Sequence, residues 1–325
     1  VIGARIAGLT AYVYRFDGTE WIEEAMLTPL DFASSDAVGP PVSVSGDAVV
    51  IGTNGDGSAY VYRFDGTNWL EEARLAASDA TYGDCFGASV FISGDVAVVG
   101  APSVGLECSP LPGSITSAAY IFRFDGEDWN EEARLTASDT AEGSLFNFFG
   151  GSVSIHDDVT LIGAGSEGAY LYRFDGSTWV EESKLIPSDV SGSFGISAVS
   201  ISGDVAVIGG VLASAVGGDP GSASSAAYVY RFDGTNWIEQ AKLTGSDPAD
   251  GVNSLGESDY FGNSVSVSGD VLVIGAENDG NTGQRFSLDG SGAAYVFSVA
   301  PDCPSPTLKS TRRSWTTNGS ATSSG

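Results

Sequence analysis

Residues 59–69 read Ala-Tyr-Val-Tyr-Arg-Phe-Asp-Gly-Thr-Asn-Trp, and close copies of this stretch recur along the chain. Its first eight residues have counterparts at 11–18, 119–126, 169–176 and 227–234, and a diverged copy, AYVFSVA, occupies 294–300. In the five complete copies a tryptophan follows the first tyrosine by nine residues, at Trp21, Trp69, Trp129, Trp179 and Trp237. Successive copies lie 48 to 67 residues apart. Such a period is typical of a protein built from one repeated supersecondary unit.

Each repeat contains four strand patterns. Aromatic side chains alternate along residues 59–64, which predicts a strand with one large-residue face. Residues 95–101 are apolar at nearly every position, as in a strand that is buried on both faces. The Trp-x-Glu-Glu-Ala-x-Leu pattern at 69–75 is compatible with a short helix, but its alternation and charge favour an exposed edge strand. Short Ser-Gly-Asp and Asp-Gly segments between the patterns predict tight hairpin turns.

Four antiparallel strands repeated at this period predict an all-β fold, a β-propeller of four-stranded blades. The first repeat lacks its first strand and the last lacks its fourth, so 22 strands in six blades are visible. A seven-bladed ring truncated at the N-terminus is the alternative. We expect residues 1–300 to form the propeller, a monomeric part of a larger protein. Residues 301–325 are rich in serine and threonine, which predicts a disordered tail or linker.

The repeats resemble the FG-GAP repeat, which occurs in integrin α-subunit heads and in many secreted bacterial proteins. The resemblance rests on a Phe-Gly pair before the first strand of a repeat and on a Gly-Ala ending of the second strand. The matching residues are Phe86-Gly87 with 99–102, Phe149-Gly150 with 162–164, Phe194-Gly195 with 208–209, and Phe261-Gly262 with 274–276, while Val38-Gly39 is a diverged position. The resemblance covers residues 1–300 and implies the fold. It implies little about function, because one fold hosts many functions.

Integrin-like blades often bind calcium in a DxDxDG loop between the first and second strands. That connection is only Ser-Gly-Asp here, too short to surround an ion that takes six or more oxygen ligands, and DxDxDG occurs nowhere in the chain. We therefore transfer no metal site from the family and expect no required cofactor. The acidic loops are the place where Ca²⁺ is still a candidate ligand.

The net charge of −28 reflects 42 acidic against 14 basic residues. Such a balance disfavours nucleic acid as a partner, and no apolar run is long enough to span a membrane. The three cysteines and single histidine lack the spacing of a zinc site. Cys85 and Cys108 fall in loops on the same side of one repeat, so we predict a disulfide between them. A disulfide suits an oxidising compartment, and we expect a secreted or cell-surface protein.

Loop length locates the candidate binding face. The turns that join the first to the second strand and the third to the fourth are nearly constant. The stretch from the aspartate that opens the second strand to the tyrosine of the third varies from 12 to 25 residues, and the loops after the fourth strand vary too. Both variable connections open on one side of an antiparallel meander, which we call the variable-loop face. Loops on a rigid scaffold usually carry binding residues. The candidate ligand-binding residues are Tyr82, Asp84, Glu107, Asp219, Asp247, Asp250, Asp259, Tyr260, Asn278, Asp279 and Asn281.

Tyrosine beside aspartate and asparagine is typical of surfaces that contact sugars or proteins. We therefore expect an extracellular binding or adhesion module for a glycan or a protein. One alternative is a propeller-fold polysaccharide-degrading enzyme that uses carboxylates of the variable-loop face. We predict no catalytic residue, because the single histidine, His156, lies in a constant turn and lacks a candidate nucleophile. The other alternative is a passive spacer in a larger secreted protein.

Residues that recur in every repeat are expected to be structural. We expect the arginines of the Arg-Phe-Asp-Gly segments to pair with the glutamates of the fourth strand, and the tryptophans to pack between blades. Adjacent glutamates such as Glu71 and Glu72 should point to opposite faces of their strand.

Overall fold

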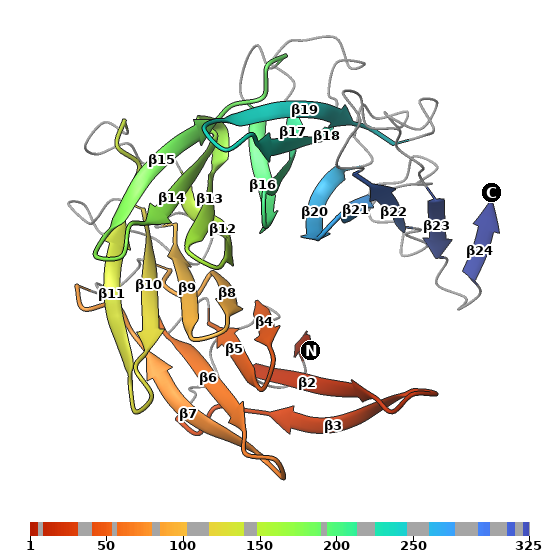
Figure 1. Ribbon diagram of the computed structural model, residues 1–325. Helices are drawn as coiled ribbons and strands as arrows, with labels where there is room; N and C mark the ends of the chain where they lie inside the picture. The colour runs from red at the N-terminus through yellow and green to blue at the C-terminus, as the bar shows by residue number, and fades with distance from the viewer. Residues whose placement is uncertain are drawn as a thin grey trace. The chain divides into compact units, whose positions relative to one another are not determined.

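The computed structural model describes residues 1–5, 9–31, 41–53, 57–79, 85–102, 117–139, 148–189, 194–212, 225–245, 260–276, 292–299, 311–315 and 321–324. Six antiparallel sheets follow one another along the chain (Figure 1). The fold is a β-propeller, as the sequence predicts, and we number its sheets as blades 1 to 6.

Blades 1 to 3 follow the predicted strand pattern. Blade 1 consists of β1 (Ile2–Arg5), β2 (Leu9–Phe16) and β3 (Trp21–Leu27). Blade 2 consists of β4 (Val42–Ser45), β5 (Ala48–Gly52), β6 (Ala59–Phe64) and β7 (Trp69–Leu75). Blade 3 consists of β8 (Ser89–Ser93), β9 (Val96–Ala101), β10 (Ala118–Phe124) and β11 (Trp129–Leu135).

Blades 4 to 6 repeat the same order. Blade 4 consists of β12 (Phe149–His156), β13 (Val159–Ala164), β14 (Ala169–Phe174) and β15 (Trp179–Leu185), with the 3-10 helix η1 (Gly165–Glu167) between β13 and β14. Blade 5 consists of β16 (Phe194–Ser202), β17 (Val205–Leu212), β18 (Ser225–Phe232) and β19 (Trp237–Leu243). Blade 6 consists of β20 (Phe261–Ser268), β21 (Val271–Ala276), β22 (Gly292–Ser298), β23 (Thr311–Trp315) and β24 (Ala321–Ser324).

The last two strands differ from the expected tail. Part of 301–325 is paired, because β23 runs antiparallel to β22, and β24 to β23. Blade 6 has no Trp-x-Glu-Glu strand, so the edge of β22 offers unpaired backbone groups that another strand can satisfy. The expected tail therefore contributes nine strand residues. Its other residues lie outside the described ones.

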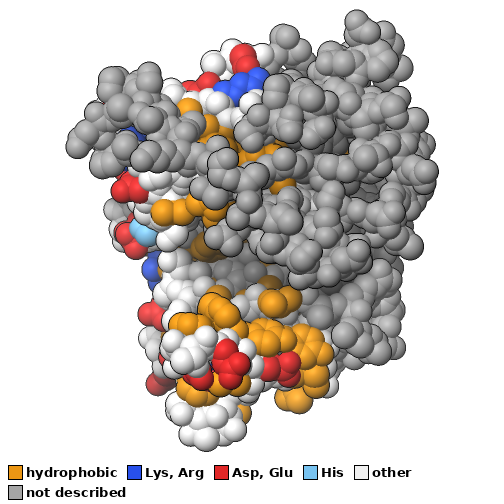
Figure 2. Space-filling model, turned by 90° about the vertical axis from the view of Figure 1, so that its right-hand side faces the viewer, with side chains coloured by type: hydrophobic (Ala, Val, Ile, Leu, Met, Phe, Trp, Pro, Cys, Tyr) orange, Lys and Arg blue, Asp and Glu red, His pale blue; other side chains and the backbone are white. Residues whose placement is uncertain are grey.

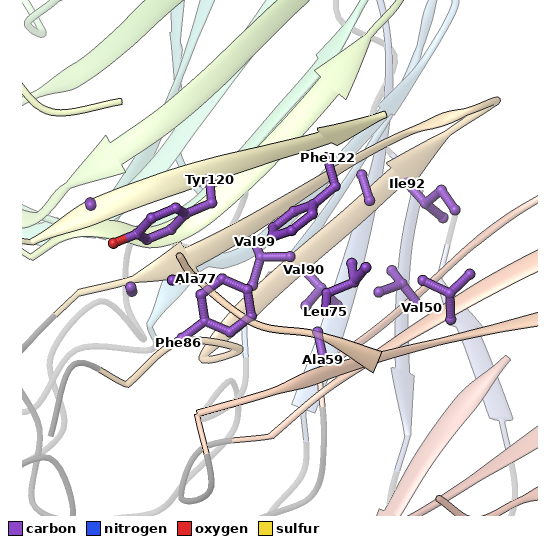
Figure 3. Packing of buried hydrophobic residues seen from close by; sticks show 14 of the residues in the cluster. Val50, Ala59, Leu75, Ala77, Phe86, Val90, Ile92, Val99, Tyr120 and Phe122 are labelled. Atoms are coloured by element: carbon purple, nitrogen blue, oxygen red, sulfur yellow. The ribbon is translucent and has the colours of Figure 1, made fainter. Parts of the chain in front are cut away.

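The chain divides into two compact units, Val1–Ile162 with Tyr172–Glu181, and Gly163–Leu171 with Glu182–Gly325. Each unit has its own hydrophobic core. In the first unit, Figure 3 shows Phe86, Val90 and Ile92 of blade 3 in one cluster with Val50 and Leu75 of blade 2. In the second, residues of blades 5 and 6 form an equivalent cluster. No helix among the described residues is long and apolar enough to cross a membrane.

A glycine pair explains the Phe-Gly and Gly-Ala motifs. Gly87, after the buried Phe86, has φ +92° and lies against the backbone of Thr53 and Ser58 in blade 2. A Cβ on Gly52, at the end of β5, would overlap the carbonyl oxygen of Gly87. A Cβ on Gly100 would likewise overlap the carbonyl oxygen of Gly150, and a Cβ on Gly209 would overlap that of Gly262. Both motif glycines are therefore needed where one blade's backbone touches the next.

A carboxylate, a guanidinium and an indole also join successive blades. Arg63 Nε donates to Glu72 Oε1 (2.6 Å) within blade 2, and Trp129 Nε1 of blade 3 donates to Glu72 Oε2 (2.8 Å). The Arg63 guanidinium lies 4.8 Å from the ring centroid of Phe124. The expected arginine–glutamate pairing and interblade position of the tryptophans are confirmed here. They are also confirmed for Arg15, Glu24 and Trp69, and for Arg123, Glu132 and Trp179.

The two glutamates of a fourth strand do face opposite blades, as expected. Glu72 bonds toward blade 3, whereas Glu71 accepts the Tyr62 hydroxyl and the Leu30 N–H from the chain after β3. Strict alternation along the strand is wrong, however. A β-bulge lies between the Val61–Ala73 and Tyr62–Glu71 pairs, so Glu72 is an extra residue.

Serine hydroxyls link the first strands of neighbouring blades. Ser43 and Ser45 accept the N–H groups of Ile92 (3.1 Å) and Gly94 (3.0 Å) in blade 3. In the same way, Ser200 and Ser202 accept the N–H groups of Val267 and Gly269 in blade 6. The first strand is the edge of its sheet, and these hydroxyls pair N–H groups that the sheet leaves open.

The turn between β12 and β13 contains a strained aspartate. Asp157 has φ +51°, where the other described turns of this kind have glycines with φ +54° to +59°. We expect Asp157→Gly to stabilise the protein by about 0.5–1 kcal/mol in urea denaturation, because it removes left-handed strain at a small entropic cost. His156→Ser, which leaves the strained residue in place, should have no effect. A loss of stability in Asp157→Gly would contradict the strain argument.

Candidate functional site

Of the eleven candidate binding residues, the structure describes Tyr260. Tyr260 is half-buried, has φ +56°, and its carbonyl accepts the Asn263 N–H (3.0 Å). Cys85 and Phe148 adopt the same conformation immediately before their Phe-Gly pairs. The conformation of Tyr260 is therefore a turn shared by three repeats, and its role as a binding residue stays a prediction.

The other ten candidates lie outside the described residues and stay predictions. They are Tyr82, Asp84, Glu107, Asp219, Asp247, Asp250, Asp259, Asn278, Asp279 and Asn281. Cys85 is disulfide-bonded. Its predicted partner Cys108 also lies outside the described residues, so the pairing stays a prediction.

The loops after the fourth strands begin on fixed stems. Ser78 follows β7, and its N–H and hydroxyl both donate to the Glu131 carboxylate of blade 3, at 2.7 and 2.9 Å. Ser138 binds Glu181 and Ser188 binds Glu239 in the same bidentate way. Each loop therefore leaves from a residue that is attached to the next blade.

The aspartates after Ser78 and Ser188 each add a second attachment. Asp79 accepts the Tyr120 hydroxyl at 2.7 Å and pairs with Arg134 at 3.0 Å. Asp189 accepts the Tyr228 hydroxyl at 2.8 Å and the Lys242 ammonium at 2.6 Å. The hydrogen bond from Lys242 holds the pKa of Asp189 below its ordinary value, and burial raises the pKa values of Tyr120 and Tyr228. These groups are committed to holding blades together and are poor candidates for acid–base chemistry.

The sequence reasoning missed these stem residues, although a signal exists. A Ser-Asp pair follows the fourth strand at 78–79, 138–139, 188–189 and 246–247. The candidate Asp247 occupies the same repeat position as Asp79 and Asp189. Recurrence of that pair indicates a structural role, which weakens Asp247 as a ligand contact.

The loops between second and third strands also begin on closed stems. In blade 3 the Ser117 hydroxyl donates to the Pro102 carbonyl at 2.5 Å. In blade 2 the Thr53 hydroxyl donates to the Ser58 carbonyl at 2.8 Å, and the Ser58 N–H donates to the Thr53 hydroxyl oxygen. The loops that vary in length on this face thus begin and end at residues that are hydrogen-bonded to each other.

The opposite ends of the blades carry uniform turns. In blade 2, Asp65 Oδ1 accepts the backbone N–H groups of Asn68 (2.7 Å) and Thr67 (2.8 Å). Backbone hydrogen bonds of this kind hold the pKa below its ordinary value for Asp17, Asp65, Asp125, Asp175 and Asp233. These carboxylates accept the N–H groups of their own turns, which gives them a structural role.

The lowered pKa values predict an acid-sensitive contribution to stability. A carboxylate with a lowered folded-state pKa stabilises the protein above the unfolded-state pKa of about 3.9, and the contribution is lost as pH falls through the folded-state value. We expect wild type to exceed Asp65→Asn/Asp125→Asn in unfolding free energy near neutral pH. The difference should shrink between about pH 5 and pH 2. A difference that is constant with pH would contradict the prediction. Asp128→Asn at the exposed part of the same turn is the control.

Among the described residues, no group of three or more histidine, cysteine, aspartate or glutamate side chains could hold a metal ion. Calcium at the acidic loops therefore stays a prediction.

The comparisons with solved structures concern the fold. A functionally unknown protein from Desulfotomaculum acetoxidans matches with a TM-score of 0.57 and 10% identity, over 96% of this chain and 90% of its own. A candidate 6-phosphogluconolactonase from Bacteroides fragilis matches with a TM-score of 0.56 and 10% identity, over 95% and 77%. At such identities the likeness shows the architecture alone. No curated protein matches the chain.

The family profile of the FG-GAP repeat matches residues 21–62, 69–122, 129–173, 179–230 and 237–297. Each match begins at a fourth-strand tryptophan and ends in the third strand of the following blade. The family's repeat therefore spans the blade boundary that the paired glycines and the glutamate–tryptophan bonds hold together. The matches cover more than half of the chain, and the protein belongs to the FG-GAP repeat family.

Proposed function

We propose that this protein is an extracellular binding module whose variable-loop face recognises a glycan or a protein. The FG-GAP propeller fold suggests an interaction module. Propellers of this family are generally non-catalytic, and their repeats are typical of extracellular proteins. One observation carries the proposal. The loops that vary in length start from stems fixed between blades, whereas the opposite turns are uniform and internally hydrogen-bonded.

This arrangement suits recognition because the stems limit the conformational entropy that a loop loses when it binds. The candidate residues supply aromatic rings and carboxylate or amide acceptors, which are useful toward sugar hydroxyls and protein N–H groups. The acidic balance of the chain favours a neutral or basic ligand over an anionic one.

Binding of the full chain to a panel of neutral and basic polysaccharides and matrix proteins tests the proposal, with Ca²⁺ or with chelator. We expect saturable binding that Tyr82→Ala/Asp84→Ala weakens and that Glu127→Ala, in a uniform turn, leaves unchanged. Loss of binding in chelator would indicate a calcium ion in the acidic loops. Absence of binding by the folded chain in both conditions would contradict the proposal and favour a passive spacer.

A further inference from the structure

Blade 6 receives its outer strand in a different way from blade 2. In blade 2 four residues, 65–68, separate β6 from β7, whereas twelve residues, 299–310, separate β22 from β23. β7 has seven residues, and β23 has five. Figure 1 shows β23 beside β22, with β24 beyond it. The strand on the outer edge of β22 is therefore not the second arm of a tight hairpin.

β23 also covers only part of the outer edge of β22. In blade 2 the pairing with β7 includes residues 59–64 and passes through a bulge. In blade 6 the pairing with β23 includes residues 292–296, runs without a register shift and ends before residues 297–298. The counterparts of 297–298 in blade 2, residues 62–63, do pair with the fourth strand. A longer strand could therefore pair with backbone groups that lie beyond the register of β23.

The hydrogen bond that links other outer strands to the preceding blade has no counterpart in the register of β23. In blades 2, 3 and 4 the first residue of the fourth strand is a tryptophan that donates to a glutamate, as Trp129 does to Glu72. Blade 5 has Gln240 at the position of that glutamate, and its Arg231 bonds to Asp204 at 2.7 Å. The pairing of β23 ends before the position at which such a tryptophan would lie.

The register shows which kind of segment the edge favours. A basic residue lies opposite the first tyrosine of the third strand in blades 2, 3 and 5, as Arg134 lies opposite Tyr120. The Arg134 guanidinium carbon lies 5.9 Å from the Tyr120 ring centroid, close enough for cation–π attraction. In blade 6 the residue opposite Tyr295 is Arg312. We therefore expect a strand on this edge to carry a basic residue at that position.

The charge of the chain favours a basic segment too. The net charge is −28, and Figure 2 shows acidic side chains at several places on the described surface. A surface of this sign attracts a basic segment and speeds its encounter with the protein.

We propose that the outer edge of β22 is a strand-exchange site, at which an extended basic segment of a partner protein replaces β23. The segment pairs with residues 292–298 and places a lysine or arginine opposite Tyr295. Main-chain hydrogen bonds give affinity in such strand addition, and alternate side chains give specificity. The inference goes beyond the ligand-binding proposal, because it concerns a sheet edge and not the variable-loop face.

A peptide exchange experiment on the full chain tests the site. The probe is a labelled synthetic peptide of residues 305–316, SPTLKSTRRSWT. Arg312→Pro/Arg313→Pro in the full chain should raise its affinity for the probe by about tenfold, because proline prevents the chain's own strand from pairing. A probe with the same two prolines should not bind. Absence of probe binding by the proline variant, with an unchanged circular dichroism spectrum, would overturn the proposal.

Two substitutions in the probe separate register from charge. Arg312→Ala and Arg313→Ala remove the same charge, but only the first removes the residue opposite Tyr295. Arg312→Ala should weaken binding to the proline variant by about fivefold more than Arg313→Ala does. Equal losses would overturn the proposal, because the attraction would then depend on charge and not on the position in the strand.

Hydrogen exchange of the wild-type chain gives a test that needs no variant. The amides of β22 that face β23 should exchange about tenfold faster than the matching amides of β18, which pair with the seven-residue strand β19. Equal protection of β22 and β18 would overturn the proposal, because β23 would then be held as firmly as an ordinary fourth strand.

Discussion

Gly87→Ala is expected to destabilise the protein by about 3–5 kcal/mol, as the sum of left-handed strain and steric overlap. Gly87 has φ +92°, and an added Cβ would run into the backbone of Thr53 and Ser58. The neighbouring atoms are carbonyl oxygens and a peptide nitrogen of blade 2, which cannot rotate away as a side chain could. Relief would require the two blades to separate and to disturb the shared core around Phe86.

Gly66→Ala is the matched control. Gly66 has φ +96°, but an added Cβ would meet no atom within 4 Å. It should therefore cost only about 1–2 kcal/mol, the strain of the left-handed conformation. Urea denaturation of the two variants, followed by circular dichroism, separates the cost of left-handed strain from the cost of steric overlap. Equal losses would show that the close approach of the blades contributes nothing, and would contradict our explanation of the family motif.

The sequence predicts the repeated parts of this fold well, for a physical reason. An aromatic alternation such as that of residues 59–64 and an apolar run such as 96–101 specify strands directly. Five imperfect copies also allow one secondary structure to be chosen for all of them. This resolves whether the Trp-x-Glu-Glu segment, which has some helical propensity, is a helix or a strand. Bulges are harder to predict, because the register shift opposite Glu72 depends on the pairing partner and leaves no residue-specific mark.

The sequence offers less information about the candidate site than about the fold, because repetition says nothing about what differs between copies. Length variation and polarity alone point to the loop residues, and Tyr260 lies in a turn that Cys85 and Phe148 share. The role of the stem residue Asp79 is hard to predict, because a Ser-Asp pair resembles any polar loop. Its role depends on Tyr120 and Arg134, which are 41 and 55 positions away and contact it only in the folded chain.

Glu72→Ala is expected to destabilise the protein by about 2–4 kcal/mol, because it removes one acceptor from two partly buried donors. Arg63 and Glu72 have side chains only 25% and 20% exposed, and Trp129 depends on the same carboxylate. Arg63 Nη2 is already buried without a partner. Without Glu72, the nearest counter-charge of the guanidinium would be the more exposed Asp47, at 3.1 Å.

A double-mutant cycle with Trp129→Phe measures the part of this effect that crosses the blade boundary. Trp129→Phe removes the indole donor and keeps an aromatic ring, so the coupling to Glu72→Ala should be about 0.5–2 kcal/mol if the shared bond matters. Glu127→Ala, in the exposed turn of blade 3, is the control and should change stability by less than about 0.5 kcal/mol. A coupling of zero would mean that Glu72 serves Arg63 alone. The recurrence of the glutamate–tryptophan pair at three boundaries would then reflect packing of the indole and not its hydrogen bond.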